Sequence, residues 1–375
     1  MLDKRKFYID GAWVDPQDGR DLEVIDPSNE EPCAVISLGG QADTDAAVAA
    51  ARRAFIPWAE APREDRVAAV QRLYEIYKRR SDEMAEAISL EMGAPIDMSK
   101  AQQSTSGTWH IKGFLKAYEN FEHERMLGDH APNDRILMDP IGVVGMITPW
   151  NWPMNQVTLK VIPAVLVGCT CVLKPSEIAP LSSLLFAEMM DEAGFPAGVF
   201  NLVNGDGPGV GTQLSSHPDV EMISFTGSTR AGIAVTRDAA DTVKRVTLEL
   251  GGKSPNLVFA DCDLEAQVAA SVQECMYNTG QSCDAPTRLL VERRCYDKAL
   301  QIAKATACSI AVGDPAQPGD HIGPLFDKIQ FDRVQRMIDV GIAEGATLLA
   351  GGPGRPEGHE TGWFVRPTVF SEVSN

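Results

Sequence analysis

The sequence predicts an α/β protein built on a parallel β-sheet, and three observations support this fold class. From residue 141 to 250, short apolar strand-like runs alternate regularly with helix-like segments. Strands that alternate with helices form parallel sheets with crossover connections. Several of these runs end in small polar residues or glycine just before a helix, as strand-to-helix turns do. A shorter alternation between 252 and 375 predicts a second α/β region.

The N-terminal part predicts a hairpin, four helices and then a less regular segment. Asp10-Gly11 between the apolar runs 7–9 and 13–14 is typical of a tight β-turn. Residues 122–140 change character and predict either a projecting hairpin or a linker. The four helices, which we expect to serve packing only, are placed at 44–55, 63–80, from Ser81-Asp82-Glu83 onward, and 99–118.

The remaining elements follow the alternation. Pro153 suits the first turn of its helix, and Gly194 is a helix stop. In the first α/β region we expect strands at 142–147, 170–173, 199–203, 222–225 and 243–250, with helices at 153–167, 181–193, up to 216 and up to 238. In the second we expect helices at 263–276, 296–310 and 328–344, and strands at 288–291, 346–350 and 363–365.

Composition limits the function classes. The chain has 375 residues and a formal net charge of -18, which argues against nucleic acid and anionic membranes as partners. The longest apolar run, 161–172, is too short and too broken to span a bilayer, and no signal peptide is visible. The eight cysteines and six histidines form no Cys-x-x-Cys pair and no zinc-like cluster. We therefore expect a reduced, cytoplasmic, soluble protein without a bound metal.

One polar loop of small side chains, residues 278–288, lies between an apolar helix-like segment and a strand-like one. It carries Cys283, and backbone N–H groups around such a thiol can favour the reactive thiolate. A lone cysteine is more often a small buried hydrophobic residue. From this residue alone, both interpretations stay open.

Two further polar residues could carry chemistry. Glu249 alternates with Leu248 and Leu250 along its strand, so its carboxylate could be partly desolvated and act as a general base. Its alternative is a solvated strand residue. Asn151 lies between two tryptophans and two prolines, where its amide could donate to an oxyanion. Its alternative is an ordinary turn asparagine.

Three strand ends are candidates for binding a cofactor. The turn 226–228 would bring helix N–H groups and a hydroxyl to one point, which suits a pyrophosphate, although Ser228 could simply cap its helix. Lys174 and Glu177 follow a central strand. A glutamate there can accept hydrogen bonds from a ribose diol, and the alternative is a surface ion pair. The glycine-rich segment 205–211 lacks the dinucleotide-binding spacing and is as readily a tight turn.

Taken together, five motifs resemble those of the aldehyde dehydrogenase superfamily. The resemblance runs from Phe7 to about Phe370, so it covers nearly the whole chain. Five motifs in the same order arise by chance far more rarely than any one of them. The motifs are Pro149-Trp150-Asn151-Trp152-Pro153, Lys174-Pro175-Ser176-Glu177, Phe225-Thr226-Gly227-Ser228-Thr229, Glu249-Leu250-Gly251-Gly252-Lys253 and Gly280-Gln281-Ser282-Cys283.

The resemblance implies a role for each reactive residue. Cys283 would attack the aldehyde carbonyl, and the Asn151 side chain together with the Cys283 N–H would hold the oxyanion. Hydride would pass to a nicotinamide and leave a thioester, and Glu249 would activate the water that hydrolyses it. The presence of Glu249 favours hydrolysis over acyl transfer to coenzyme A, which is a second enzymatic alternative.

The resemblance also implies NAD as the cofactor. The adenine ribose would meet Lys174 and Glu177, the pyrophosphate would meet Trp150 and Ser228, and Glu177 would repel the 2′-phosphate of NADP. The implied cofactor-binding residues are Thr148, Pro149, Trp150, Lys174, Ser176, Glu177, Gly207, Gly211, Phe225, Thr226, Gly227, Ser228 and Leu250.

The implied architecture is a Rossmann-like NAD-binding domain (1–121 and 141–251), a small oligomerisation hairpin (122–140) and an incomplete catalytic domain (252–375). Family members continue beyond the equivalent of Asn375 and carry a Glu-x-Phe-Gly-Pro motif that this sequence lacks. We therefore expect a C-terminally truncated member whose full-length form is a homo-oligomer. The rival hypothesis is a non-catalytic remnant that binds NAD or partner subunits.

Overall fold

The computed structural model describes residues 1–374, and the chain divides into two compact units. Unit 1 contains Met1–Val24, Ala34–Ala85 and Lys100–Glu249, and unit 2 begins again at Leu250. Unit 2 also takes in two short segments, Ile25–Cys33 and Glu86–Ser99. The sequence expectation places both segments in the first domain, because nothing in their composition marks a crossing between units.

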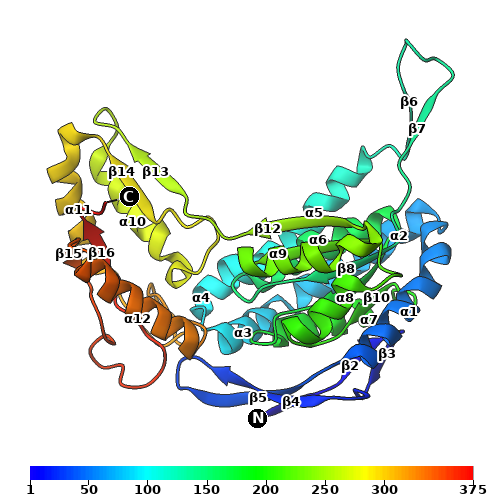
Figure 1. Ribbon diagram of the computed structural model, residues 1–375, viewed down its shortest axis with the longest axis horizontal. Helices are drawn as coiled ribbons and strands as arrows, with labels where there is room; N and C mark the ends of the chain where they lie inside the picture. The colour runs from blue at the N-terminus through cyan, green and yellow to red at the C-terminus, as the bar shows by residue number, and fades with distance from the viewer. Residues whose placement is uncertain (375) are drawn as a thin grey trace. The chain divides into compact units, whose positions relative to one another are not determined.

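The centre of unit 1 is a seven-stranded sheet in the order β12-β11-β8-β9-β10-β2-β3 (Figure 1). The neighbours β11 and β8, β8 and β9, and β9 and β10 pair in parallel, which confirms the predicted parallel α/β sheet. Numbered along the chain, its five C-terminal strands run 3-2-1-4-5, an order found in dinucleotide-binding sheets. These strands are β8 (Val143–Ile147), β9 (Thr170–Lys174), β10 (Phe200–Leu202), β11 (Met222–Gly227) and β12 (Arg245–Leu250).

The predicted first hairpin forms one edge of this sheet. Strands β2 (Phe7–Ile9) and β3 (Ala12–Val14) pair antiparallel with Tyr8 opposite Trp13. The turn residue Asp10 has a positive φ of 55°, as the turn between two such closely joined strands requires. β2 then pairs antiparallel with β10, so the hairpin closes the parallel region on that side.

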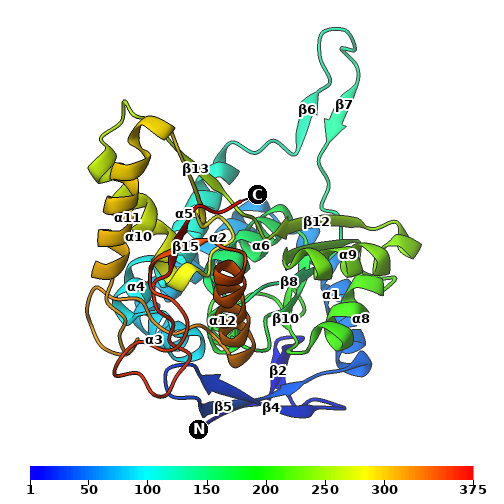
Figure 2. The same ribbon diagram turned by 60° about the vertical axis from the view of Figure 1, so that its left-hand side comes forward.

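Helices cover both faces of the sheet, as parallel strands buried on both sides require (Figures 1 and 2). The helices of one face are α1 (Gln41–Ala59), α8 (Thr212–Ser216) and α9 (Thr229–Asp238). The other face carries α6 (Pro153–Val167) and α7 (Leu181–Glu192), with α2 (Arg63–Arg79) and α5 (Thr105–Glu119) packed behind them. As predicted, α6 has Pro153 in its first turn.

The helix expected at 99–118 begins with a different turn. Residues Ser99–Ser104 form a π-helical turn, η1, that leads directly into α5. Short π-helical segments are rare and are often associated with functional sites. Before them lie α3 (Ser81–Met92) and the single turn α4 (Ile96–Met98).

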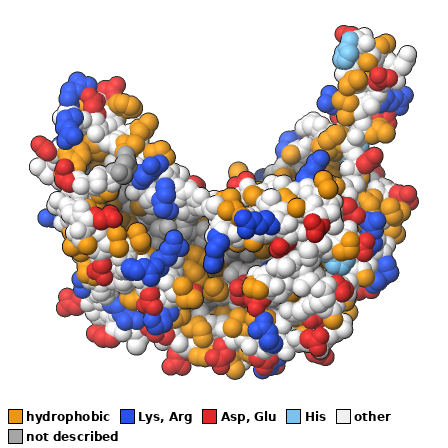
Figure 3. Space-filling view, in the orientation of Figure 1, with side chains coloured by type: hydrophobic (Ala, Val, Ile, Leu, Met, Phe, Trp, Pro, Cys, Tyr) orange, Lys and Arg blue, Asp and Glu red, His pale blue; other side chains and the backbone are white. Residues whose placement is uncertain are grey.

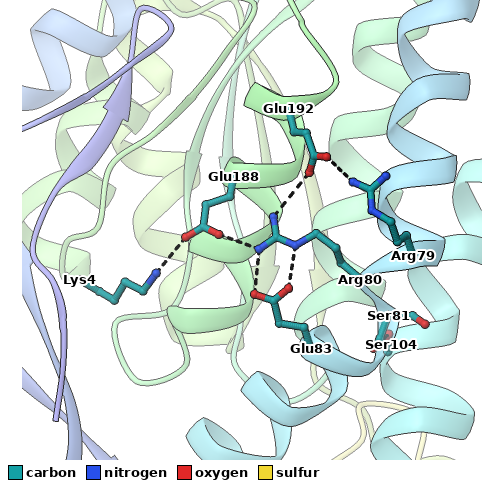
Figure 4. A network of polar contacts seen from close by, with 8 residues as sticks. All are labelled: Lys4, Arg79, Arg80, Ser81, Glu83, Ser104, Glu188 and Glu192. Carbon is teal, nitrogen blue, oxygen red and sulfur yellow. Dashed lines mark hydrogen bonds and ion pairs between the residues drawn. The ribbon is translucent and has the colours of Figure 1, made fainter.

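A small sheet of β1 (Leu2–Lys4), β5 (Glu31–Leu38) and β4 (Arg20–Asp26) was not expected from the sequence. An ion-pair network fixes β1 to the helices of unit 1 (Figure 4). Lys4 pairs with Glu188 at 2.9 Å, and Arg80 pairs with Glu188 at 2.9 Å and with Glu83 at 2.7 Å. The arginine therefore links the end of α2 to both α3 and α7.

Residues 122–140 form the projecting hairpin, which decides between the two alternatives for this segment. Strands β6 (Glu124–Met126) and β7 (Arg135–Leu137) pair antiparallel and extend away from the sheet of unit 1 (Figures 1 and 2). Apolar side chains on it face solvent, as Figure 3 shows. They are Met126, Leu127, Leu137 and Met138, each at least 41% exposed.

Unit 2 has its own apolar core around two helices, α10 (Leu264–Met276) and α11 (Tyr296–Ser309). Strand β13 (Pro255–Val258), which the sequence did not predict, pairs in parallel with β14 (Arg288–Val291). Strands β15 (Thr347–Ala350) and β16 (Val369–Ser371) pair antiparallel, and α12 (Lys328–Ala343) completes the unit.

The strand predicted at 363–365 is wrong. Trp363 and Val365 are buried against Leu325, but the backbone of this run bonds to loops. The Leu325 N–H donates to the Trp363 carbonyl, and the Trp363 N–H donates to the Pro27 carbonyl. An apolar run of three residues therefore fills the core without joining a ladder.

Within residues 1–374, no helix combines the length and the apolar character needed to cross a bilayer. The same residues contain no group of three or more His, Cys, Asp or Glu side chains placed to hold a metal ion. All eight cysteines are free thiols in the described part of the chain.

Candidate functional site

The candidate cofactor residues of unit 1 lie at one edge of its sheet. Ile147, the last residue of β8, is level with Lys174 of β9 and with Phe225 of β11. The carboxyl ends of these three strands therefore coincide. After β8, the chain forms β9 and β10 on one side of β8 and then β11 on its other side. The direction in which strands are added to the sheet therefore reverses between β8 and β11. Ligands of open α/β sheets bind at such switch points.

Two segments of predicted cofactor-binding residues flank this switch point. Thr148 to Trp150 follow β8, and the Thr148 N–H donates to the Lys174 carbonyl at 3.2 Å. Phe225 to Ser228 end β11 and begin α9. The structure thus brings residues far apart in sequence to neighbouring strand ends.

Lys174 and Glu177 form an ion pair, but not a surface one. The Lys174 Nζ lies 2.9 Å from the Glu177 Oε2 and also donates to the Pro175 carbonyl at 3.0 Å. The lysine side chain is 5% exposed and the glutamate side chain 31% exposed. The buried ammonium group fixes a carboxylate that can still accept hydrogen bonds from solvent or a ligand.

Ser228 caps α9, as the helix-capping interpretation of this residue predicts. Its hydroxyl oxygen accepts a hydrogen bond from the Ala231 N–H at 3.2 Å, and the residue is exposed. The N–H groups of the first turn of α9 point to the same side, so this helix start can also receive an anion. Capping and anion binding are compatible at this position.

The glycine-rich segment after β10 is a capped tight turn. The Asp206 carboxylate accepts from the Gly209 N–H at 2.7 Å and begins a π-helical turn, η2 (Gly207–Gly211). Just before it, Asn204 is fully buried, and neither polar atom of its side-chain amide has a hydrogen-bond partner. Such an amide is rare in folded proteins, and it marks a place where a ligand or a water molecule belongs.

Glu249 is exposed, which favours the solvated-residue alternative over partial desolvation of its carboxylate, and the alternation along β12 is confirmed. The Arg245 N–H donates to the carbonyl of Glu221, which precedes β11, so β11 and β12 start at the same end. Glu249 therefore comes near the end of β11, on the solvent-facing side of its strand.

Lys160, which was not among the residues predicted from the sequence, lies near this carboxylate. Its Nζ donates to the Thr226 hydroxyl at 2.7 Å from a buried position on α6. Burial lowers the pKa of Lys160 to about 8, and the Glu249 carboxylate acts in the opposite direction. The available signal was a single lysine among the apolar residues Val157, Val161 and Ile162 of a helix that packs on the sheet.

Asn151 lies in the bend between β8 and α6, with Trp150 and Trp152 on either side. Its backbone carbonyl accepts a hydrogen bond from the side-chain amide of Gln103 at 3.0 Å. Gln103 is fully buried in the π-helical turn η1. No sequence pattern indicates this pairing, because 48 residues separate the two positions.

In unit 2, Cys283 is exposed, which argues against the buried-hydrophobic interpretation. The loop before it contains left-handed backbone at Asn278 (φ 51°) and at the β-branched Thr279 (φ 57°). Strained conformations of this kind persist only when their surroundings hold them, and they cluster at functional sites. Here Gln281 does so, since its amide donates to the Asn278 carbonyl at 3.0 Å and accepts from the Phe326 N–H at 3.1 Å.

Two of the recognised motifs adjoin in unit 2. A Cβ added at Gly252 would lie 3.0 Å from the Cys283 carbonyl oxygen, so a larger residue would require the two backbones to move slightly apart. The Arg288 side chain donates to the Lys253 carbonyl at 2.9 Å. Unit 2 thus groups Cys283 with the segment that begins at Leu250, while Asn151, Glu249 and the cofactor candidates other than Leu250 belong to unit 1.

Comparison with known proteins shows the family to which the chain is related. A model of the aldehyde dehydrogenase family matches residues 13–375. A 3-succinoylsemialdehyde-pyridine dehydrogenase from a Pseudomonas species is 48% identical over 375 residues, which are 100% of this chain and 78% of that protein.

Two solved structures are similar throughout the chain. An aldehyde dehydrogenase from Bartonella henselae has a TM-score of 0.98 and 57% identity, covering 100% of this chain and 78% of that one. A cysteine-to-alanine mutant of aldehyde dehydrogenase C from Pseudomonas syringae, in complex with NAD+ and octanal, has a TM-score of 0.96 and 48% identity, covering 99% and 76%.

Proposed function

Because this chain belongs to the aldehyde dehydrogenase family, we propose that it oxidises an aldehyde to a carboxylic acid with NAD as hydride acceptor. The observation that carries the proposal is the convergence of the cofactor candidates at the ends of β8, β9 and β11, around the switch point of the sheet. The complex of a similar protein with NAD+ and octanal supports both the cofactor and the substrate class.

The residues at this edge fit a dinucleotide. The helix start at Ser228 offers N–H groups for the pyrophosphate, together with Trp150. The fixed Glu177 carboxylate can accept from both hydroxyls of a ribose, and it would repel a 2′-phosphate, which favours NAD over NADP. The unpartnered amide of Asn204 adds a buried donor and acceptor at the next strand end. The complete set is the one implied by the resemblance, from Thr148 to Leu250.

NAD, when bound, supplies the hydride acceptor, and the protein's own residues supply the remaining chemistry. The exposed Cys283 thiolate attacks the aldehyde carbonyl and forms a thiohemiacetal. The Asn151 side-chain amide and the Cys283 N–H donate to the developing oxyanion. Loss of hydride converts the thiohemiacetal into a thioester on Cys283.

Hydrolysis then requires an activated water, and we assign this step to Glu249. Its carboxylate takes a proton from the water that attacks the thioester carbonyl. The Lys160 ammonium is near this carboxylate, and its Nζ donates a hydrogen bond to the Thr226 hydroxyl. The products are the carboxylic acid and the free Cys283 thiol.

The projecting hairpin supports the proposal that the protein forms a homo-oligomer. It also supports the proposed division into a cofactor domain (1–121 and 141–251), a hairpin (122–140) and a catalytic domain (252–375). Four apolar side chains on β6 and β7 or beside them face solvent, on a strand pair with open edges. Open strand edges and exposed apolar side chains are both suited to association with another chain. We assign the hairpin to contacts with a second copy.

The function is tested by incubating the purified chain with NAD and octanal and following NADH formation and octanoate. The Cys283→Ala variant should abolish both products, whereas Cys308→Ala, which removes another exposed thiol of unit 2, should leave them unchanged. Binding of NAD without any turnover by the wild-type chain would reject the dehydrogenase proposal in favour of a binding function.

A further inference from the structure

We propose that Gln103 is a positioning residue that holds Asn151 in the orientation needed to stabilise the oxyanion. The inference rests on the role proposed above for Asn151. Gln103 does not touch the reacting atoms in this proposal, because its contact is with the Asn151 backbone. Its side-chain Nε2 donates to the Asn151 carbonyl oxygen at 3.0 Å, and both residues belong to unit 1.

The bend around Asn151 has few backbone donors of its own. Pro149 and Pro153 carry no N–H, and the first hydrogen bond of α6 runs from Gln156 to the Trp152 carbonyl. The Asn151 carbonyl lies before that bond and is held by a side chain from another element. Fixing this carbonyl restricts rotation about the Cα–C bond of Asn151, and so limits the directions in which its side chain can point.

Gln103 is itself anchored to other helices. The next residue, Ser104, donates from its hydroxyl to the Ser81 carbonyl at 2.8 Å, and both are labelled in Figure 4. The Tyr77 hydroxyl donates to the Ser104 carbonyl at 3.0 Å. The Ser106 hydroxyl donates to the Gln103 carbonyl at 2.7 Å. The amide that reaches Asn151 thus starts from a backbone tied to the α2–α3 corner of unit 1.

The π-helical turn explains why this glutamine faces inward. Gln103 is fully buried while its neighbour Gln102 is exposed, so the turn sends only one of two adjacent glutamines into the protein. A π-helical turn widens the helix locally and changes which side chains point inward. A buried side-chain amide is costly unless it is used, and here it holds the bend that carries Asn151.

The test compares Gln103→Leu, which keeps the size of the side chain but removes the donor, with the matched control Gln102→Leu. We expect Gln103→Leu to lower kcat by about tenfold to a hundredfold, because a misplaced oxyanion donor loses part of its effect. The KM for NAD should stay close to that of the wild type. Gln102→Leu should behave as the wild type. An unchanged kcat in Gln103→Leu overturns the inference.

A double-mutant cycle with Asn151→Ala separates positioning from a general structural role. If Gln103 acts through Asn151, adding Gln103→Leu to Asn151→Ala should lower kcat no further. Independent, multiplied losses overturn the inference. Full turnover by Asn151→Ala alone would instead reject the proposed oxyanion role, so the two failures are distinguishable.

Hydrogen exchange gives a readout that does not depend on turnover. In Gln103→Leu, the N–H groups of Asn151 and Trp152 should exchange faster than in the wild type and in Gln102→Leu. Exchange in β9 serves as the internal reference for correct folding. Unchanged exchange at the bend in a folded Gln103→Leu variant overturns the inference.

Discussion

Lys160 gives the most quantitative prediction, through the variant Lys160→Met. The lysine is buried, and burial lowers its pKa from 10.5 to about 8. Methionine has a similar shape without the charge, so the substitution removes the titration and the hydrogen bond to Thr226. Loss of the hydrogen bond also changes the free energy of unfolding, but this contribution does not depend on pH over the alkaline range.

The sign and size of the pH dependence follow from the two pKa values. Below pH 8 the lysine is protonated in both the folded and unfolded chains, so the cost of burying the charge is fully present. Between pH 8 and 10.5 the unfolded chain binds more protons, and the stability of the wild type rises with pH. At about 1.4 kcal/mol per pH unit, the full gain is about 3 kcal/mol.

The assay is urea unfolding of the wild type and Lys160→Met at several pH values from neutral to above 10.5, in reducing buffer. The difference between the two free energies of unfolding should change by about 3 kcal/mol in favour of the wild type as pH rises. Lys116→Met, at an exposed lysine, should show no such change. A constant difference across the range would refute the reasoning.

Three further outcomes follow from the structure. Glu177→Gln should raise kcat/KM for NADP by about tenfold, measured against NAD, because the repelling carboxylate is gone; unchanged preference contradicts the assignment. Arg80 lowers the pKa of Glu83 through a hydrogen bond. At pH values above the ordinary pKa of Glu83, the variant Glu83→Gln should therefore have a free energy of unfolding about 0.5 kcal/mol lower than that of the wild type. That difference should vanish as pH falls through the depressed pKa, and its persistence in acid contradicts the pairing. Leu137→Asp should weaken self-association measured by light scattering, and unchanged mass contradicts the role of the hairpin.

The sequence predicted the parallel sheet and most helices because local signals and the final fold agree there. Pro153 starts α6 and Gly194 follows α7, as their backbone preferences require. The unpredicted strand β5 begins with Glu31-Pro32, and a proline with a charged residue is a poor strand signal. Its partners β1 and β4 are rich in charged residues, so the small sheet depends on tertiary pairing.

Some residues of the candidate site could be predicted from the sequence, and others could not. Residues in motifs, such as Lys174, Glu177 and Ser228, could be found from turn chemistry at strand ends. Gln103 could not, because it acts on a partner brought near by folding and glutamine is not unusual in a helix. Lys160 offered only one signal, a single lysine among apolar helix residues, and its partner Thr226 is brought near by folding. Glu249 is a different case, since alternation predicted its side of the strand but left open how much of that side is covered.

In the proposed mechanism, the thiol of Cys283 carries the acyl group. Mixing the chain with NAD and octanal, stopping the reaction with acid and digesting the protein allows the peptide containing Cys283 to be weighed by mass spectrometry. The account predicts an octanoyl thioester on Cys283 whose amount increases in Glu249→Gln, because that variant forms the thioester but hydrolyses it slowly. NADH formation without any acyl group on Cys283 in either protein would contradict the account.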